Sequence, residues 1–260
     1  MEKQMSKVVG RPITSRENPR LKRWQQLLDS RGIRKNQHCL FFGERIVREI
    51  LQSRPDHCLE LIYPTSWPQL LQAPAMVSHY VLEGQLFKTL DVFGTGAPLL
   101  VCKIPAIRQW DHTEAPRGLE LVCPLGDPSN VGALLRTCQA FGVQKVILLK
   151  EAASPFHPKS TRAASGAVFN VDCVYGPSIE ELNHNNLAST IVALDVTGND
   201  LSGFPWSKNV RILIGEEGQG LPGKGFSQKA AIPMIKGMHS LNAVVAASIA
   251  MYAYRLQHPL

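Results

Sequence analysis

The stretch LELVCPLGDPSNVGALLRTCQAFG, residues 119–142, decides the fold class of this chain. Its first five residues form a short, mostly apolar run, which is typical of a buried strand. A loop containing Asp127 and Pro128 follows, and apolar residues then recur at helical spacing until Gly142 ends the helix. A strand that leads through a short loop into a helix is the repeating unit of a parallel sheet covered by helices.

The same alternation continues to the end of the chain. After the strand at 119–123 and the helix at 131–141, strands are predicted at 145–149, 171–174, 190–194 and 211–214, and helices at 159–165, 179–187 and 241–256. We therefore expect an α/β domain over residues 119–260, with helices on both faces of a parallel sheet.

The part of the chain before this domain has the pattern of a smaller α/β domain. Strands are predicted at 39–42, 59–63, 77–81 and 98–104, and helices from Pro19 onward, at 45–51 and at 84–90. Residues 105–118, PAIRQWDHTEAPRG, contain two prolines and break the pattern, which predicts an inter-domain linker. The expected domains are therefore 1–104 and 119–260.

The composition is that of an ordinary globular protein, with 44% apolar and 19% charged residues. No apolar run approaches the roughly 20 residues that span a bilayer, and residues 1–11 lack the apolar core of a signal peptide. We therefore expect a cytoplasmic protein that does not bind a membrane. The six cysteines form no C-x-x-C pair, and adjacent His and Cys residues on a strand point to opposite faces, so no metal site is predicted.

The positive charge is concentrated in the N-terminal part. Residues 1–108 carry 16 Lys and Arg against 9 Asp and Glu, whereas residues 109–260 carry 12 of each, so the first part holds the whole net charge of +7. A basic domain beside a neutral one is typical of a polyanion-binding module, although a solvated basic surface would have the same composition. The candidate nucleic-acid-binding side chains are Arg16, Arg20, Lys22, Arg23, Arg34, Lys35 and Arg45.

Ligands of parallel α/β sheets bind beyond the carboxyl ends of the strands, and the loop at 125–132 occupies such a position. A turn and a helix cap, provided by Asp127 or Asn130, would explain most of this loop. They do not explain Arg136, which lies on an otherwise apolar helix close to the loop.

Two later loops have unusual residues as well. GEEGQGL at 215–221 has neither a Walker A ending nor the position of a dinucleotide fingerprint, and its carboxylates suit hydroxyl or ammonium groups better than phosphate. Its glycines permit close backbone approach to a ligand. The loop at 232–242 leads into a helix rich in Ala and Val, which Ser240 or Asn242 can cap.

Together these loops resemble the three ordered motifs of the SpoU/TrmH family of RNA ribose 2′-O-methyltransferases, part of the SPOUT superfamily. The stretches are DPSNVGALLRTCQAFG (127–142), IGEEGQGL (214–221) and IPMIKGMHSLNAVVAA (232–247), and 159–169 resembles the region between the first two. Upstream, 13–28, 41–51 and 86–105 resemble the substrate-binding domain that precedes the catalytic domain in many members, notably those that act on ribosomal RNA.

The resemblance implies an α/β trefoil-knot (SPOUT) methyltransferase domain preceded by a small α/β RNA-binding domain. It implies S-adenosyl-L-methionine as the cofactor, RNA as the substrate and a homodimer whose active site draws on both subunits. The catalytic residues that it implies are Asn130, Arg136, Glu216, Ser240 and Asn242. The cofactor-binding residues that it implies are Leu194, Gly215, Ile232 and Leu241.

The implied mechanism is in-line attack of a ribose hydroxyl on the cofactor methyl group. Arginine is effectively always protonated, so we expect Arg136 to hold the target phosphate and polarise the hydroxyl rather than act as a base. Asn130 would hold the ribose or Arg136, and Glu216 would orient them. One departure from the family pattern is that Ile235 and Lys236 stand before Gly237, where members usually have a small residue, and this concerns the path of the cofactor loop.

The expected function is therefore methylation of a ribose 2′-hydroxyl in RNA, with ribosomal RNA favoured over transfer RNA. A non-catalytic RNA-binding protein that retains the fold is one alternative, and a knotted enzyme that methylates a base is another. A nicotinamide-dependent oxidoreductase is disfavoured because the glycine fingerprint of a dinucleotide site is missing.

Overall fold

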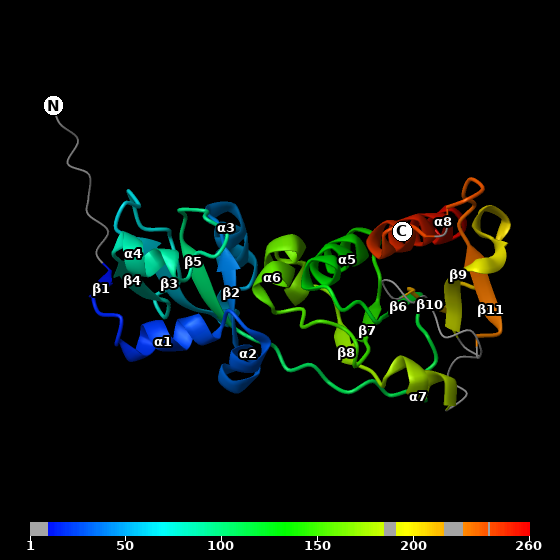
Figure 1. The fold of residues 1–260 in the computed structure, drawn as a ribbon, viewed down its shortest axis with the longest axis horizontal. Coiled ribbons are helices and arrows are strands. Elements are labelled where there is room, and N and C mark those ends of the chain that lie inside the picture. The colour runs from blue at the N-terminus through cyan, green and yellow to red at the C-terminus, as the bar shows by residue number, and fades with distance from the viewer. Residues whose placement is uncertain (1–9, 185–190, 216–225, 239) are drawn as a thin grey trace. The chain divides into compact units, whose positions relative to one another are not determined.

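In a computed structural model of the chain, the structure describes residues 10–184, 191–215, 226–238 and 240–260. The chain divides into two compact units (Figure 1). The first unit consists of Met1–Pro105 and Ser154–Gly166, and the second consists of Ala106–Ala153 and Ala167–Leu260. The units differ from the expected domains in the predicted linker and in residues 154–166.

The first unit is built on a mixed five-stranded sheet. Its strands are β1 (Arg11–Ile13), β2 (His38–Phe42), β3 (Cys58–Pro64), β4 (Ser78–Leu82) and β5 (Leu99–Lys103). They lie in the order β1-β4-β3-β5-β2, with β4 parallel to β1 and β3 and with β5 antiparallel to β3 and β2. Its helices are α1 (Pro19–Gln26), α2 (Ser30–Asn36), α3 (Glu44–Ser53), α4 (Gly84–Lys88) and α6 (Pro158–Ala164), with the 3-10 turn η1 (Pro55–His57).

Helix α1 begins where the sequence predicts it. The Asn18 side chain accepts a hydrogen bond from the backbone N–H of Arg20 at 2.9 Å, and Pro19 occupies the first helical position. Leu21 and Trp24 are fully buried in the core of this unit. Burial of these two side chains fixes α1 against the sheet and leaves its charged side chains on the outer surface.

Helix α6 belongs to the first unit, although the sequence pattern assigns its residues to the domain 119–260. The Thr161 hydroxyl is buried and donates a hydrogen bond to the backbone oxygen of Leu40 on β2 at 2.7 Å. The Arg162 guanidinium lies 4.4 Å from the centre of the Phe93 ring. These contacts join residues far apart in the chain, so local periodicity does not reveal them.

The second unit is built on a six-stranded sheet whose paired strands are all parallel. Its strands are β6 (Leu119–Cys123), β7 (Lys145–Leu148), β8 (Cys173–Tyr175), β9 (Ile191–Asp200), β10 (Val210–Leu213) and β11 (Gln228–Ala231), in the order β11-β9-β10-β6-β7-β8. Its helices are α5 (Pro128–Ala140), α7 (Ile179–His184) and α8 (Ala243–Gln257), with the 3-10 turns η2 (Ala167–Phe169) and η4 (Leu201–Gly203). In Figure 1, α5 and α8 lie on one side of this sheet and α7 on the other, which confirms the expected α/β architecture.

Strand β11 and the second half of β9 are not predicted from the sequence. The two strands pair in parallel, with a shift of register between Lys229 and Ala230. A Cβ atom at Gly198 would lie 2.6 Å from the backbone of Lys229, so the close approach of β9 and β11 requires glycine there. The predicted trefoil knot remains an expectation, because the second motif falls largely on 216–225, outside the described residues.

The predicted linker packs against the second unit over part of its length. The backbone N–H of Trp110 donates to the oxygen of Tyr175 on β8 at 2.7 Å, and the Trp110 side chain is buried. Beneath it, Arg211 on β10 and Lys145 on β7 flank Glu120 on β6, at 2.8 Å and 3.7 Å from its two carboxylate oxygens. The buried Glu120 therefore neutralises charges from both neighbouring strands. No helix within the described part of the chain is long and apolar enough to cross a membrane.

Candidate active site

The loops after β6 and β10 begin at one edge of the second sheet, beside the first half of β9. Leu213, the last residue of β10, pairs with Val122 on β6 and with Ala193 on β9. Gly215 lies two residues after the end of β10, and Leu194 follows Ala193 within β9. A Cβ atom at Gly215 would lie 3.8 Å from the backbone oxygen of Leu194, so these two expected cofactor residues are neighbours.

Packing against the described residues does not require glycine at Gly215, because 3.8 Å is an ordinary van der Waals distance. Gly126, in the loop after β6, has the same 3.8 Å clearance from the oxygen of Glu151. Both glycines therefore leave room at this edge that a side chain could occupy without a clash. That room suits a ligand that is held by backbone groups.

The N-terminus of α5 is capped by Asp127, not by Asn130. The Asp127 carboxylate accepts hydrogen bonds from the backbone N–H groups of Ser129 at 2.8 Å and Asn130 at 3.0 Å, and Pro128 takes the first helical position. The half-buried Asn130 side chain is therefore not needed to cap the helix.

Arg136 lies on the exposed face of α5. The buried face of this helix is formed by Val131, Gly132, Leu134, Leu135 and Cys138. Six residues separate Arg136 from Asn130, which corresponds to about 9 Å along the axis and roughly 120° between the two directions. Within the described residues the Arg136 guanidinium makes no hydrogen bond or ion pair. One chain therefore presents Asn130 and Arg136 on different sides of α5.

The N-terminus of α8 is capped by Asn242, one of the two residues that the sequence suggests. Its side-chain oxygen accepts hydrogen bonds from the backbone N–H groups of Val244 at 2.9 Å and Val245 at 3.3 Å. Ser240 and Leu241 are exposed just before it. The cap occupies the oxygen of Asn242, so its NH₂ group is the part that can still donate to a ligand.

The loop from β11 to α8 contains the residues that depart from the family pattern. Ile232 follows β11 directly and is half-buried. Ile235 to Met238 then form a turn, in which the Met238 N–H donates to the oxygen of Ile235 at 3.2 Å. Gly237 has a φ of 95°, a conformation that glycine adopts without strain. Ile235 and Lys236 are therefore accommodated in an exposed turn. Glu216, the remaining expected catalytic residue, lies outside the described residues.

An apolar stripe runs along the exposed side of α8 and was not predicted from the sequence. It consists of Leu241, Val245, Ile249, Tyr252 and Leu256, which are between 36% and 67% exposed. Their spacing of three and four residues places them on one helical face. A continuous exposed apolar face of this kind is typical of a protein interface.

The candidate RNA-binding residues of the first unit fall into two groups. Arg20 and Arg23 form ion pairs with the buried Glu60 at 2.9 Å and 2.5 Å, and the Trp24 indole N–H donates to the same carboxylate at 2.7 Å. Lys22 pairs with Glu17. The side chains of the second group are exposed and form no ion pair within the described residues: Arg16, Arg34, Lys35 and Arg45.

Asp195, directly after Leu194, is a charged group that the sequence did not single out. Burial opposes its ionisation, but hydrogen bonds from Thr197 and from Lys229 outweigh burial and hold the pKa of Asp195 below its ordinary value. The ion pair with Lys229 at 3.1 Å ties β9 to β11 beside the expected cofactor residues. Within the described residues no group of three or more His, Cys, Asp or Glu could hold a metal ion.

Comparison with known proteins extends these observations. The model of the SpoU rRNA Methylase family matches residues 121–252. Ribosomal RNA small subunit methyltransferase G 2 of Syntrophobacter fumaroxidans is 43% identical over 94% of this chain, but the chain spans only 49% of that relative. The 23S rRNA (guanosine(2553)-2′-O)-methyltransferase RlmP of Bacillus subtilis is 27% identical over 94% of this chain and 98% of its own length.

Solved structures share the fold over nearly the whole chain. The AdoMet-bound rRNA methyltransferase from Sinorhizobium meliloti aligns with a TM-score of 0.78 and 23% identity, over 96% of this chain and 98% of its own. The SpoU methyltransferase AviRb from Streptomyces viridochromogenes, in complex with AdoMet, aligns with a TM-score of 0.74 and 22% identity, over 93% and 98%.

Proposed function

The chain belongs to the SpoU rRNA methylase family, and we propose that it transfers a methyl group from S-adenosylmethionine to a ribose 2′-hydroxyl of RNA. The observation that carries this proposal is the meeting of Leu194, Gly215 and the Asn130 loop at one edge of the parallel sheet. The Bacillus subtilis relative, whose name specifies a 2′-O-methyltransferase of 23S rRNA, matches this chain along almost its full length. Ribosomal RNA in the cytoplasm is therefore the favoured substrate.

The residues at this edge fit the proposed cofactor. Gly215 and Gly126 leave space there that internal packing does not use, and Leu194 offers a backbone oxygen beside it. Ile232 and Leu241 lie at the two ends of the loop that joins β11 to α8, so they would form the apolar part of the pocket. The bound cofactor would supply the electrophilic methyl group, and the protein would supply position and orientation.

The polar residues would act on the RNA. Asn130, at the N-terminus of α5, would hold the ribose. Arg136 would hold the phosphate next to the target nucleotide with its planar guanidinium and polarise the hydroxyl. Ser240 and the NH₂ group of Asn242 would hold the same nucleotide from the N-terminus of α8. The exposed Arg16, Arg34, Lys35 and Arg45 would bind the RNA backbone.

We also propose a homodimer formed through the apolar stripe on α8. A two-fold axis brings the same patch of both subunits together, and a single helical stripe can pack against its own copy. Arg136 is directed into solvent in one chain, away from the side on which Asn130 lies. In a dimer, Arg136 of one subunit would contribute to the active site of the other subunit.

The test of this function is transfer of labelled methyl groups from S-adenosylmethionine to ribosomal RNA from cells that lack the gene. Ribose-methylated nucleotides are then mapped in RNA from cells with and without it. The expected result is one ribose-methylated site that depends on the protein. Methylation of a base would favour the base-methylating alternative, and binding of RNA without any methyl transfer would favour the non-catalytic one.

A further inference from the structure

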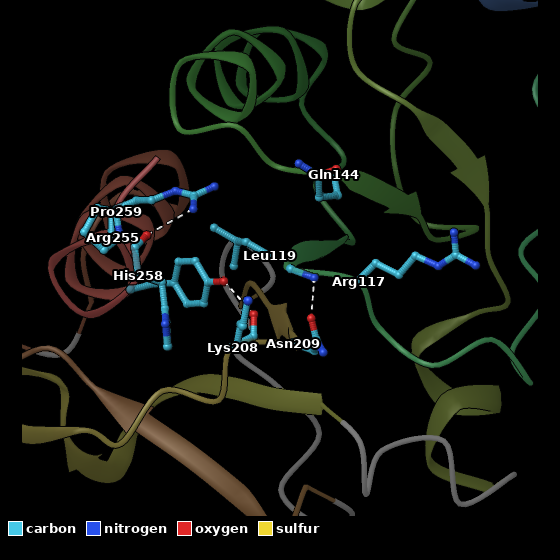
Figure 2. A pocket seen from close by; sticks show the side chains of 10 residues that line it. Arg117, Leu119, Gln144, Lys208, Asn209, Arg255, His258 and Pro259 are labelled. Carbon is cyan, nitrogen blue, oxygen red and sulfur yellow. Dashed lines mark hydrogen bonds between the residues drawn. The ribbon is translucent and has the colours of Figure 1, made fainter.

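A pocket lies at the edge of the six-stranded sheet that is opposite the candidate active site. It has a volume of about 240 Å³ and opens between the start of β6, the residues before β10 and the end of α8 (Figure 2). The five residues of β6 separate the two edges by roughly 15 Å. The pocket therefore lies away from Asn130, Leu194 and Gly215, which are at the active-site edge.

One wall of the pocket is held rigidly by backbone contacts. The Arg255 guanidinium donates to the oxygens of Phe141 at 2.8 Å, Gly142 at 3.0 Å and His258 at 3.1 Å. The Tyr254 hydroxyl donates to the oxygen of Lys208 at 2.6 Å, which joins α8 to the segment before β10. These groups are committed to the fold and shape the pocket.

Other lining side chains keep unused hydrogen-bonding capacity. The Asn209 side-chain oxygen accepts from the Gly118 N–H at 2.7 Å, which leaves its NH₂ group to donate. The side chains of Lys208 and Arg117 are exposed and form no hydrogen bond or ion pair within the described residues. Figure 2 shows the Arg117 side chain extending away from Arg255 and His258, which places it at the rim.

The charge of the lining is positive. Lys208, Arg117 and Arg255 are cations, and no Asp or Glu lines the pocket. The nearest carboxylate in contact is Glu120, which accepts from the backbone N–H of Arg117 at 3.1 Å but is already neutralised by Arg211 and Lys145. The exposed side chains of Lys208 and Arg117, together with the NH₂ group of Asn209, can bind an anion at the surface.

We infer that this pocket binds a phosphate group of the RNA backbone, so that the second unit holds RNA at both edges of its sheet. The inference rests on the proposed function, because it takes RNA as the ligand. It adds to that function a contact about 15 Å from the sheet edge that holds Asn130, Leu194 and Gly215, which a mononucleotide at that edge could not make. RNA longer than a few nucleotides should therefore bind more tightly than its target nucleotide alone.

The test compares two double variants of the full chain. Arg117→Gln/Lys208→Gln removes the pocket cations. Arg108→Gln/Lys150→Gln, the matched control, removes two exposed cations of the same unit that are already paired with Asp172 and Glu181. Binding of a labelled single-stranded RNA of mixed sequence is measured as a function of salt. The slope of log affinity against log salt should become shallower by about 0.7 in the pocket variant, because one phosphate contact on a single strand contributes about that much.

Affinity for S-adenosylhomocysteine should be unchanged in both variants, which confirms that the active-site edge is intact. The inference would be overturned if the pocket variant kept the wild-type salt slope, or if the control variant changed the slope by the same amount. In either case, methyl transfer by the wild type would still uphold the proposed function. If the wild type neither binds nor methylates RNA, both fail. Inorganic phosphate or adenosine monophosphate could raise the melting temperature of the wild type but not of the pocket variant. If RNA binding were unchanged in that variant, the pocket would be assigned to a small phosphorylated molecule instead.

Discussion

The carboxylate of Asp127 accepts a hydrogen bond from the backbone N–H of Asn130 at 3.0 Å. The residue that caps α5 and the candidate ribose ligand therefore lie on the same helical turn. Because Asp127 alone provides the cap, substitution of Asp127 should mainly lower stability, and substitution of Asn130 should mainly lower activity.

We expect Asp127→Ala to lower the free energy of unfolding by about 1 kcal/mol, the usual cost of a lost N-cap. Asn130→Ala leaves the Asp127 cap in place and should abolish most methyl transfer. Urea denaturation and a labelled-methyl assay measure the two effects. Asp127→Asn, which retains a capping oxygen, is the control. An Asn130→Ala variant with full activity would remove Asn130 from the site.

The buried Glu120 gives a second prediction. Its carboxylate neutralises Arg211, whose side chain is 2% exposed, and Lys145. Glu120→Ala should cost about 3–5 kcal/mol, because it leaves the buried Arg211 guanidinium without a carboxylate, whereas Lys145 keeps its ion pair with Glu114. The double variant Glu120→Leu/Arg211→Met should recover much of this loss, since an apolar pair carries no desolvation penalty. Equal destabilisation of the single and double variants, measured by denaturant titration, would argue against this account.

The sequence predicts the elements that burial alone determines. The apolar run at 119–123 is predicted as a strand and is observed as β6 with the same bounds, because all five residues are buried. Strand β11 is missed since Gln228 and Lys229 interrupt any apolar pattern. Helix α2 is also missed, and its Gly32 is required because a Cβ atom there would lie 1.9 Å from the oxygen of Gln26.

The sequence predicts the parts of the candidate site that are formed by loops at the ends of strands. It does not predict the contacts between residues that lie far apart in the chain. The position of Gly215 follows from a strand that ends at one edge of a parallel sheet, whereas Leu194 lies within β9, which continues to Asp200. The partner of Arg20 and Arg23 does not follow, because Glu60 lies 37 to 40 residues away on another element. Charge counts therefore identify the basic unit but not which of its cations remain available.

Ser165, at the end of α6, provides a prediction about strain. Its φ is 53° and its ψ is −130°. Residues other than glycine tolerate a positive φ mainly when ψ is also positive, so this conformation is strained for serine. Ser165→Gly should therefore stabilise the protein by up to about 1 kcal/mol, whereas Ser165→Ala should give no gain. Thermal denaturation of both variants measures the effect. A Gly variant less stable than the wild type would mean that the serine side chain makes a contribution larger than the strain.

The apolar stripe on α8 leads to a prediction about assembly. Ile249→Glu places a charge at the centre of the proposed dimer interface and should convert the dimer to a monomer in light scattering. The free chain already exposes Ile249, so its own fold should survive. Met76→Glu, at another exposed apolar residue in the first unit, is the control and should leave the mass unchanged. A wild-type monomer at micromolar concentration would contradict the proposed dimer.

The last prediction concerns Arg136, which is exposed on α5 and forms no ion pair within the described residues. Arg136→Ala should therefore leave the unfolding free energy and the affinity for S-adenosylhomocysteine unchanged, while methyl transfer falls by orders of magnitude. Arg136→Lys should restore little, because a point charge cannot replace the planar fork that grips a phosphate. Gln139→Ala, on the exposed side of the same helix, controls for surface changes and should be silent. Wild-type transfer rates in Arg136→Ala would show that Arg136 is an ordinary surface arginine.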